Sequence, residues 1–211
     1  MLSNGMAGKI AKGQKKYLKN ITAGVKEITG LIETLLNLSR MQMGTFMINP
    51  RPMNLPIFMD KLVDSFSMQL KKKKLFLKKH YGSDIPKINL DPQITQLILE
   101  NIFSNAIKYT EKGGIEVKIE KNQKDIIVEI SDTGCGIPEI QKHLVFTKLF
   151  RSDNILKNKT KGYGLGLYIV QTLVKNSGSK ISFESIEGKG TRFFVSFPLK
   201  GMKKKVQQSL L

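Results

Sequence analysis

Three polar residues, Asn101, Asn105 and Lys108, are of types and at spacings that could do chemistry. They lie in the stretch DPQITQLILENIFSNAIKYT, residues 91–110, whose apolar residues recur with the period of a helix. At spacings of four and three, the polar side chains share the side of that helix opposite the apolar face. Amide oxygens can ligate a hard cation such as Mg²⁺, and an ammonium group beside them can hold phosphate. A plain polar helix face is the alternative, and a phosphate-binding loop elsewhere would decide between the two.

Glycine-rich loops elsewhere in the sequence are candidates for that role. Asp132 ends a predicted strand and is followed by Gly134 and Gly136, so backbone can approach a flat ligand while the carboxylate accepts from an exocyclic amine. A plain tight turn is the alternative for this segment. Glycines also alternate in KGYGLGL, residues 161–167, at the start of a predicted helix, where free N–H groups bind phosphate. Residues 144–160, between the two loops, are long enough to form a mobile lid.

The remaining pattern predicts an α+β fold, a two-layer α/β sandwich with helices on one face of a mixed, mainly antiparallel sheet. Asp91 followed by Pro92 is a helix start, because it joins a side-chain acceptor to a proline that loses nothing in the first turn. The predicted helices span residues 15–44, 55–73, 91–110 and 163–176. The predicted strands span residues 75–81, 87–90, 115–120, 125–131, 181–185 and 192–198. A third glycine loop, GKGTRF, belongs to the last hairpin.

The segment Asn49–Pro52 interrupts both helix and strand and is the predicted domain boundary. We expect a leader or remnant at residues 1–14, a long helix within residues 15–50, a globular domain at residues 51–199 and a frayed basic tail at residues 200–211. Along the long helix, apolar residues repeat at alternating fours and threes from Tyr17 to Leu35. We call this row of apolar side chains the seam of the helix. It is expected to pack either on the domain that follows in the sequence or in a helical bundle with other copies of the chain.

Composition narrows the classes of function. The chain of 211 residues has no apolar run approaching a membrane span and no N-terminal signal pattern. Its single cysteine, Cys135, excludes an internal disulfide and suits a reducing cytosol, so a cytoplasmic location is expected. No Cys/His spacing resembles a metal site. The net charge of +18 raises nucleic acid or an anionic membrane as partners. The lysines are spread along the chain, however, and nucleic-acid motifs are absent, which favours a solvated basic surface with nucleotide phosphate as its specific anion.

In order and spacing, these motifs resemble the ATP-binding catalytic domain of histidine protein kinases, within the wider GHKL ATPase superfamily. ENIFSNAIKYT is similar to the N box, DTGCGIP and GYGLGL to the two main glycine boxes, FTKLFR to the F box and GKGTRF to the last glycine box. The resemblance covers about residues 51–199. It implies a Bergerat-type ATP-binding fold that takes ATP and Mg²⁺.

The resemblance also implies roles for individual residues. The implied Mg²⁺ ligands are Asn101 and Asn105. The implied phosphate contacts are Lys108, Arg151 and the loop residues Gly162, Gly164, Leu165, Gly166 and Leu167. In the implied adenine pocket, Asp132 would accept a hydrogen bond from the adenine amine, and Thr191 would share a water molecule with Asp132. The other implied pocket residues are Tyr109, Gly134, Gly136 and Ile137. The implied catalytic set is Asn101, Asn105, Lys108 and Arg151.

Three residues depart from the family pattern. Leu149 stands where the F box often has a second Phe, and Tyr163 stands where Thr or Ser is common, so either could alter the order of the lid. Asn101 stands where hydrolysing members of the superfamily carry a glutamate base. Because water is poorly activated without such a base, this residue favours a kinase over an ATPase.

The long N-terminal helix resembles the second helix of the family's dimerisation and phosphotransfer hairpin. The family's phosphoacceptor motif, H-E-x-x-x-P, does not occur in this sequence, and His80 and His143 are predicted to be ordinary surface residues. The implied function is transfer of the ATP γ-phosphoryl group to a histidine elsewhere, with slow or absent self-phosphorylation. Expected partners are the acceptor helix, a response regulator and a second copy of the chain through the N-terminal helix. No specific nucleic-acid partner is expected. Membrane association is expected only through segments upstream of this sequence. A GHKL-type ATPase switch and a catalytically silent nucleotide-binding module are the alternatives.

Overall fold

The computed structural model describes residues 47–150 and 164–204, together with scattered positions between residues 11 and 39. The chain separates into two compact units, residues 1–46 with 207–211 and residues 47–206. All the asparagine and glycine motifs belong to the larger unit.

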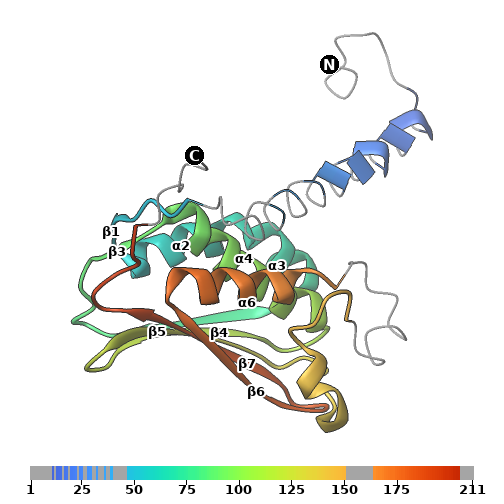
Figure 1. Cartoon of the computed structure of the whole chain (residues 1–211). Helices are drawn as coiled ribbons and strands as arrows, with labels where there is room; N and C mark the ends of the chain where they lie inside the picture. Colours follow the sequence, from blue (N-terminus) through green and yellow to red (C-terminus); the bar gives the residue numbers. More distant parts are fainter. Residues whose placement is uncertain are drawn as a thin grey trace. The chain divides into compact units, whose positions relative to one another are not determined.

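The larger unit is built on a five-stranded sheet with the strand order β2-β4-β5-β7-β6. Its strands are β2 (Phe76–Tyr81), β4 (Gly114–Lys121), β5 (Asp125–Asp132), β6 (Lys180–Ile186) and β7 (Gly190–Pro198). β2 and β4 are parallel, and every other neighbouring pair is antiparallel. The helices lie on one face of the sheet (Figure 1): α2 (Leu55–Ser65), α3 (Ser67–Lys73), α4 (Pro92–Tyr109) and α6 (Gly166–Ser177). The predicted two-layer α/β sandwich is therefore confirmed.

Alternating residues along the strands produce the two layers. In β4, Ile115, Val117 and Ile119 are fully buried on the side that the helices cover. Glu116 and Lys118 alternate with them and are only partly buried. The period of two therefore places the apolar side chains in the core and the charged ones on the opposite face.

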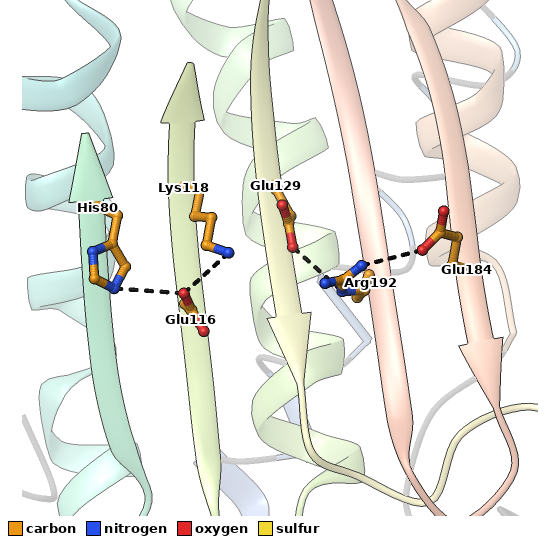
Figure 2. A network of polar contacts seen from close by, with 6 residues as sticks. All are labelled: His80, Glu116, Lys118, Glu129, Glu184 and Arg192. Carbon is orange, nitrogen blue, oxygen red and sulfur yellow. Dashed lines mark hydrogen bonds and ion pairs between the residues drawn. The ribbon is translucent and has the colours of Figure 1, made fainter. Parts of the chain in front are cut away.

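The face of the sheet without helices carries a network of ion pairs, which Figure 2 shows. Glu116 Oε1 lies 3.5 Å from His80 Nε2 and 3.3 Å from Lys118 Nζ. Arg192 extends the same pattern across the next strands by pairing with Glu129 and Glu184 at 3.5 Å and 3.3 Å. His80 is an exposed member of this surface, and His143 is exposed as well, so the prediction that both are surface residues is confirmed.

The N-terminus of α4 is fixed by the side chain predicted to cap it. Asp91 Oδ1 accepts hydrogen bonds from the N–H groups of Gln93 and Ile94, at 2.9 Å and 3.1 Å. The other carboxylate oxygen, Oδ2, accepts from the N–H of Asn49 at 2.7 Å. One buried carboxylate therefore holds both the start of the helix and the segment that enters the domain.

The C-terminus of α4 is held by a lysine from another helix. Lys73 Nζ donates to the carbonyl oxygens of Ile107, Lys108 and Thr110, at 2.6, 2.9 and 3.0 Å. Carbonyls at a helix C-terminus lack partners within the helix, and a cation there also opposes the negative end of the helix dipole. Lys73 thus stabilises the end of α4 that lies next to the glycine loops.

Two helix predictions are wrong in their bounds. The helix expected over residues 55–73 is divided into α2 and α3 at Phe66 (φ −98°, ψ 2°), whose ring packs edge-on against Phe103 with centroids 5.4 Å apart. The helix expected from Tyr163 begins only at Gly166. Gly164 has φ +68°, which is incompatible with a right-handed helix, so the helix cannot include it.

Two predictions about irregular segments are also wrong. Asn49–Pro52 was expected to interrupt strands, but Arg51–Met53 forms β1, which pairs with β3 (Ile88–Leu90) in a separate two-stranded sheet. An edge strand tolerates proline because one side of its backbone needs no partner. The start of the tail is ordered rather than frayed, because Met202 is buried and its N–H donates to the carbonyl of Asn89 at 2.8 Å.

In the smaller unit, the described positions between residues 13 and 39 are helical. The predicted seam is solvent-exposed along this helix in the single chain. Exposed fractions run from 52% to 70% for Tyr17, Ile21, Val25, Ile28 and Ile32. Leu35 and residues 1–10 of the predicted leader lie outside the described residues. Within the described part of the chain, no helix is both long and apolar enough to cross a membrane.

Candidate nucleotide-binding site

The polar face of α4 meets the glycine loop that opens α6. Asn101, Asn105 and Lys108 are all half-buried on this face. Asn101 Nδ2 donates to the carbonyl of Leu97 at 2.7 Å, which orients the amide. A Cβ atom added to Gly166 would lie 2.6 Å from Asn101 Oδ1, closer than real Cβ contacts. The absence of a side chain at Gly166 therefore lets the start of α6 approach the amide oxygen.

The start of α6 is suited to binding an anion. Leu165 is the N-cap residue, and its apolar side chain cannot satisfy the N–H groups of the first turn, which include those of Gly166 and Leu167. Gly164 precedes it with φ +68°, and a Cβ there would lie 2.6 Å from the carbonyl oxygen of Phe150. The end of the F box is thus in contact with the glycine loop. Gly162, Tyr163 and Arg151 lie outside the described residues.

The segment before this loop is anchored to the sheet. Residues Glu139–Leu144 form a 3-10 helix, η2, that the sequence did not predict. Val145 is buried, and the ring of Phe146 packs edge-on against Phe183 of β6 with centroids 5.7 Å apart. Leu149, the departure from the F box, adopts φ +62°. The part of the predicted lid beyond residue 150 lies outside the described residues.

Near the C-terminal end of α4 lies the buried carboxyl group of Asp132, the last residue of β5. Asp132 Oδ1 accepts from the N–H of Gly134 at 2.8 Å. Thr191 is the residue directly opposite on β7, so the two side chains share one face of the sheet. Burial raises the pKa of Asp132 to about 6, against a weaker opposing effect of the N–H groups of Gly134 and Thr191.

The turn after Asp132 fits closely against α4 and β6. A Cβ on Gly134 would lie 2.5 Å from the carbonyl oxygen of Tyr109, the last residue of α4. The same carbonyl accepts from the N–H of Cys135 at 3.3 Å. Gly136 has φ +64° and lies against the backbone of Ile186 at the end of β6. The structure therefore brings Tyr109, Asp132 and both glycines of this turn together.

Lys108 and Tyr109 lie side by side at the C-terminal end of α4. Lys108 Nζ donates to the phenol oxygen of Tyr109 at 3.0 Å and lies 4.7 Å from the centroid of its ring. This contact holds the ammonium group of Lys108 beside the ring of Tyr109.

A serine that the sequence analysis did not single out connects the turn after β5 with the start of β7. Ser185 Oγ, on β6, accepts from the N–H of Ile137 at 2.8 Å, donates to the carbonyl of Gly190 at 3.0 Å and lies 2.9 Å from Thr191 Oγ1. Nothing local in the sequence marks this residue, because its partners come from two other segments. The sequence could have indicated only that Ser185 lies in a predicted strand just before the last glycine loop.

The donor set fits a hard cation bound together with phosphate. Among the described residues, no group of three His, Cys, Asp or Glu side chains could hold a metal by itself. The amide oxygen of Asn101, turned toward the N-terminus of α6, is instead a neutral hard donor beside an anion site. Such a donor suits Mg²⁺, which is usually bound through few protein ligands plus substrate phosphates.

One helix thus connects a buried carboxyl group with the uncapped N-terminus of a second helix in a two-layer α/β sandwich, an arrangement suited to binding a nucleotide. The sequence agrees: residues 90–201, more than half of the chain, match the family described as histidine kinase-, DNA gyrase B-, and HSP90-like ATPase. The chain belongs to this family. The resemblance inferred from the five motifs is therefore confirmed.

Curated relatives are sensor kinases. The signal transduction histidine-protein kinase BarA of Escherichia coli (strain K12) is 33% identical over 187 residues, which cover 86% of this chain and 20% of BarA. The sensor histidine kinase WalK of Bacillus subtilis (strain 168) is 31% identical over 173 residues, or 81% of this chain and 28% of WalK. The chain therefore spans little more than a quarter of these relatives at most.

Solved structures share the fold. The full-length ShkA structure in complex with AMPPNP has a TM-score of 0.79 at 20% identity, covering 99% of this chain and 42% of ShkA. A nucleotide-free catalytic domain of the histidine kinase ThkA has a TM-score of 0.63 at 25% identity and covers 72% of this chain and 96% of that domain.

Proposed function

We propose that this chain binds ATP with Mg²⁺ and transfers the γ-phosphoryl group to a histidine of a partner helix. The observation that carries the proposal is that α4 touches both glycine loops. Tyr109, its last residue, contacts Gly134, whereas Asn101 contacts Gly166. Eight residues of helix separate the two contacts by roughly 12 Å along the axis, a span suited to a base at one end and phosphates at the other.

The adenine would bind at the end of β5. In this proposal, the carboxylate of Asp132 accepts a hydrogen bond from the exocyclic amine, and Thr191 shares a water with it. Gly134, Gly136 and Ile137 shape the wall on which the base rests, and Tyr109 closes the side toward α4. Support comes from the burial of Asp132 and from the close backbone approach at Gly134.

The phosphates would bind at the N-terminus of α6. The proposed contacts are Lys108, Arg151 and the loop residues Gly162, Gly164, Leu165, Gly166 and Leu167. Asn101 and Asn105 would hold Mg²⁺ through their amide oxygens, and the ion would neutralise charge on the triphosphate. These side chains and the α6 amides orient the γ-phosphorus, and the lid excludes water during transfer.

In the transfer, the bond between the γ-phosphorus and the β,γ-bridging oxygen breaks and its electron pair leaves with ADP. An imidazole nitrogen of the acceptor forms the new bond to phosphorus. The acceptor is proposed to lie on another helix, because both histidines of this sequence are exposed and neither lies in an α-helix. The sensor kinases among the relatives support this class of acceptor and, downstream, a response regulator that receives the phosphoryl group.

We further propose that residues 15–50 form a dimerisation and phosphotransfer segment and residues 51–199 the catalytic domain, acting in the cytoplasm. The exposed apolar residues of the N-terminal helix, from Tyr17 to Ile32, support association with a second copy.

A binding experiment tests the nucleotide site. ADP and a non-hydrolysable ATP analogue are titrated by calorimetry, with and without Mg²⁺, into wild type, Asp132→Asn and Asp125→Asn. Asp125 begins the same strand and is a matched control. Wild type and Asp125→Asn should bind with a strengthening by Mg²⁺, and Asp132→Asn should lose binding. Failure of wild type to bind either nucleotide would contradict the proposal.

A transfer experiment tests the kinase activity. The chain is mixed with radiolabelled ATP and an acceptor hairpin from a sensor kinase, and labelled acceptor is scored for an acid-labile, alkali-stable bond. Asn105→Ala should abolish transfer, whereas Gln96→Ala, an exposed amide on the same helix, should not. Steady phosphate release without any acceptor would point to an ATPase switch instead.

A further inference from the structure

Ser185 is a buried hydroxyl for which the proposed function leaves a role open. It lies on β6 with 5% of its surface exposed, and its Oγ atom has a partner in each of three directions. A serine hydroxyl has one hydrogen to donate and two lone pairs to accept with. Three contacts therefore use all of its hydrogen-bonding capacity.

The directions of these bonds follow from the chemistry of the partners. The N–H of Ile137 can only donate, so Ser185 accepts there. The carbonyl of Gly190 can only accept, so the Ser185 hydrogen points to it. Either hydroxyl could donate in the third contact, 2.9 Å between Ser185 Oγ and Thr191 Oγ1, and we assign the donor as Thr191 because the one Ser185 hydrogen is used by Gly190.

We propose that Ser185 sets the base selectivity of the pocket by fixing the hydroxyl hydrogen of Thr191 away from the ligand. Thr191 then presents only lone pairs toward the space that it shares with Asp132. The carboxylate of Asp132 also only accepts when it is ionised. The two polar side chains at the end of β5 and β7 thus form a pocket of acceptors, which demands a donor from the base. This inference rests on the proposed nucleotide site and makes Ser185 a positioning residue that acts through Thr191.

A bridging water would not reverse this polarity. A water held between Asp132 and Thr191 would have to donate one hydrogen to each, which leaves it with lone pairs to offer. A purine with an amino group at position 6 satisfies such a pocket. A purine with a carbonyl oxygen at position 6 sets acceptor against acceptor and leaves buried groups unpaired.

The test compares ADP with IDP, which carries a carbonyl oxygen where ADP has its amine. Dissociation constants for both are measured by calorimetry on the full chain, for wild type, Ser185→Ala and Ser185→Thr. In Ser185→Ala the Thr191 hydrogen is free to turn toward the ligand and donate to the carbonyl oxygen. The ratio of IDP to ADP dissociation constants should fall about five- to tenfold, as expected for one neutral hydrogen bond. Ser185→Thr, which keeps the hydroxyl, should restore the wild-type ratio.

A second route avoids dependence on one variant. Thr191→Val removes the hydroxyl but leaves the bond between Ser185 and Ile137, and it should also lower the ratio. In the double variant, Ser185→Ala should cause no further change, because its effect passes through the missing hydroxyl. A purely structural role of Ser185 would weaken both nucleotides equally and leave the ratio unchanged.

The outcomes separate this inference from the proposed function. If wild type prefers ADP and Ser185→Ala keeps that preference, the role of Ser185 is overturned while the nucleotide site stands. An additive loss of selectivity in the double variant would also overturn it. If wild type binds neither nucleotide, both proposals fail.

Discussion

Lowering the pH from 7.5 to 5 should weaken the binding of adenosine, because protonation of Asp132 removes the acceptor proposed for its amine. Burial raises the pKa of this carboxyl from 3.8 to about 6 in the free protein. The base is proposed to bind the ionised form, so binding must lower that pKa, and affinity must rise with pH until the carboxyl is fully ionised.

The size of the effect follows from the fraction of protein with an ionised Asp132. With a pKa of about 6, roughly one molecule in eleven is ionised at pH 5 and nearly all are ionised at pH 7.5. An apparent dissociation constant varies inversely with the fraction of protein that is competent to bind. The dissociation constant for adenosine should therefore increase about tenfold between pH 7.5 and pH 5.

Adenosine is the preferred ligand because it has no phosphate that titrates in this range. Binding is followed by protein-observed NMR at half-unit steps of pH, and the carboxyl carbon of Asp132 is titrated directly with and without ligand. The free protein should titrate near pH 6, and the saturated protein should titrate lower. Asp125→Asn, at the opposite end of the same strand, should reproduce the wild-type profile.

Two results would refute this reasoning. Affinity that stays flat between pH 5 and 7.5 would mean that the base does not depend on an ionised Asp132. Affinity that rises on acidification would mean that the protonated carboxyl donates to the base, which reverses the polarity assigned to the pocket.

Three further predictions concern stability and metal dependence. Because the pKa of Asp132 is raised in the folded protein, its negative charge destabilises the folded state as the pH rises from 4 through 6. Asp132→Asn removes this charge, so its free energy of unfolding in urea should exceed that of wild type by up to about 3 kcal/mol at pH 7.5. The difference should shrink toward pH 4. A less stable variant at pH 7.5 would contradict this sign. Gly166→Ala should keep or raise the melting temperature but reduce the Mg²⁺-dependent part of nucleotide affinity about tenfold in calorimetry, because its Cβ would displace Asn101 Oδ1. An unchanged Mg²⁺ effect would argue against Asn101 as a ligand. Lys73→Met should lower the free energy of unfolding by about 0.5–1.5 kcal/mol in urea titrations, since it removes the donor to three carbonyls at the end of α4, whereas the neighbouring Lys72→Met should have little effect.

Those parts of the fold that depend on local chemistry could be predicted from the sequence. The capping pair Asp91–Pro92 marks the start of α4 because the cap bonds reach only two or three residues along the chain. The turn between β4 and β5 was equally predictable from the sequence, because Asn122 Oδ1 accepts hydrogen bonds from the N–H groups of Lys124 and Asp125 at 2.8 Å each. In both cases, the residues that make the contacts are neighbours in the sequence.

Features made by distant segments could not be predicted. The division of one predicted helix at Phe66 depends on a ring in α4, and the order of Met202 depends on Asn89, more than a hundred residues earlier. The contacts of Ser185 are a further case. Its hydroxyl bonds to Ile137, 48 residues away, and a single sequence carries no signal for such a pairing.

The burial of Asp132 explains why an acid can be useful at a position where it destabilises the folded protein. An asparagine there would avoid the penalty for a buried charge, but its amide could turn to present either a donor or an acceptor. An ionised carboxylate can only accept, and under the proposed role of Ser185 the hydroxyl of Thr191 would be restricted in the same way. The free protein therefore holds an unfavourable buried charge at Asp132, which a 6-amino purine bound as proposed would relieve by donating a hydrogen bond to it. In this view, the loss of stability without ligand and the recognition of adenine have the same cause, so Asp132→Asn should gain stability and lose the binding of ADP together.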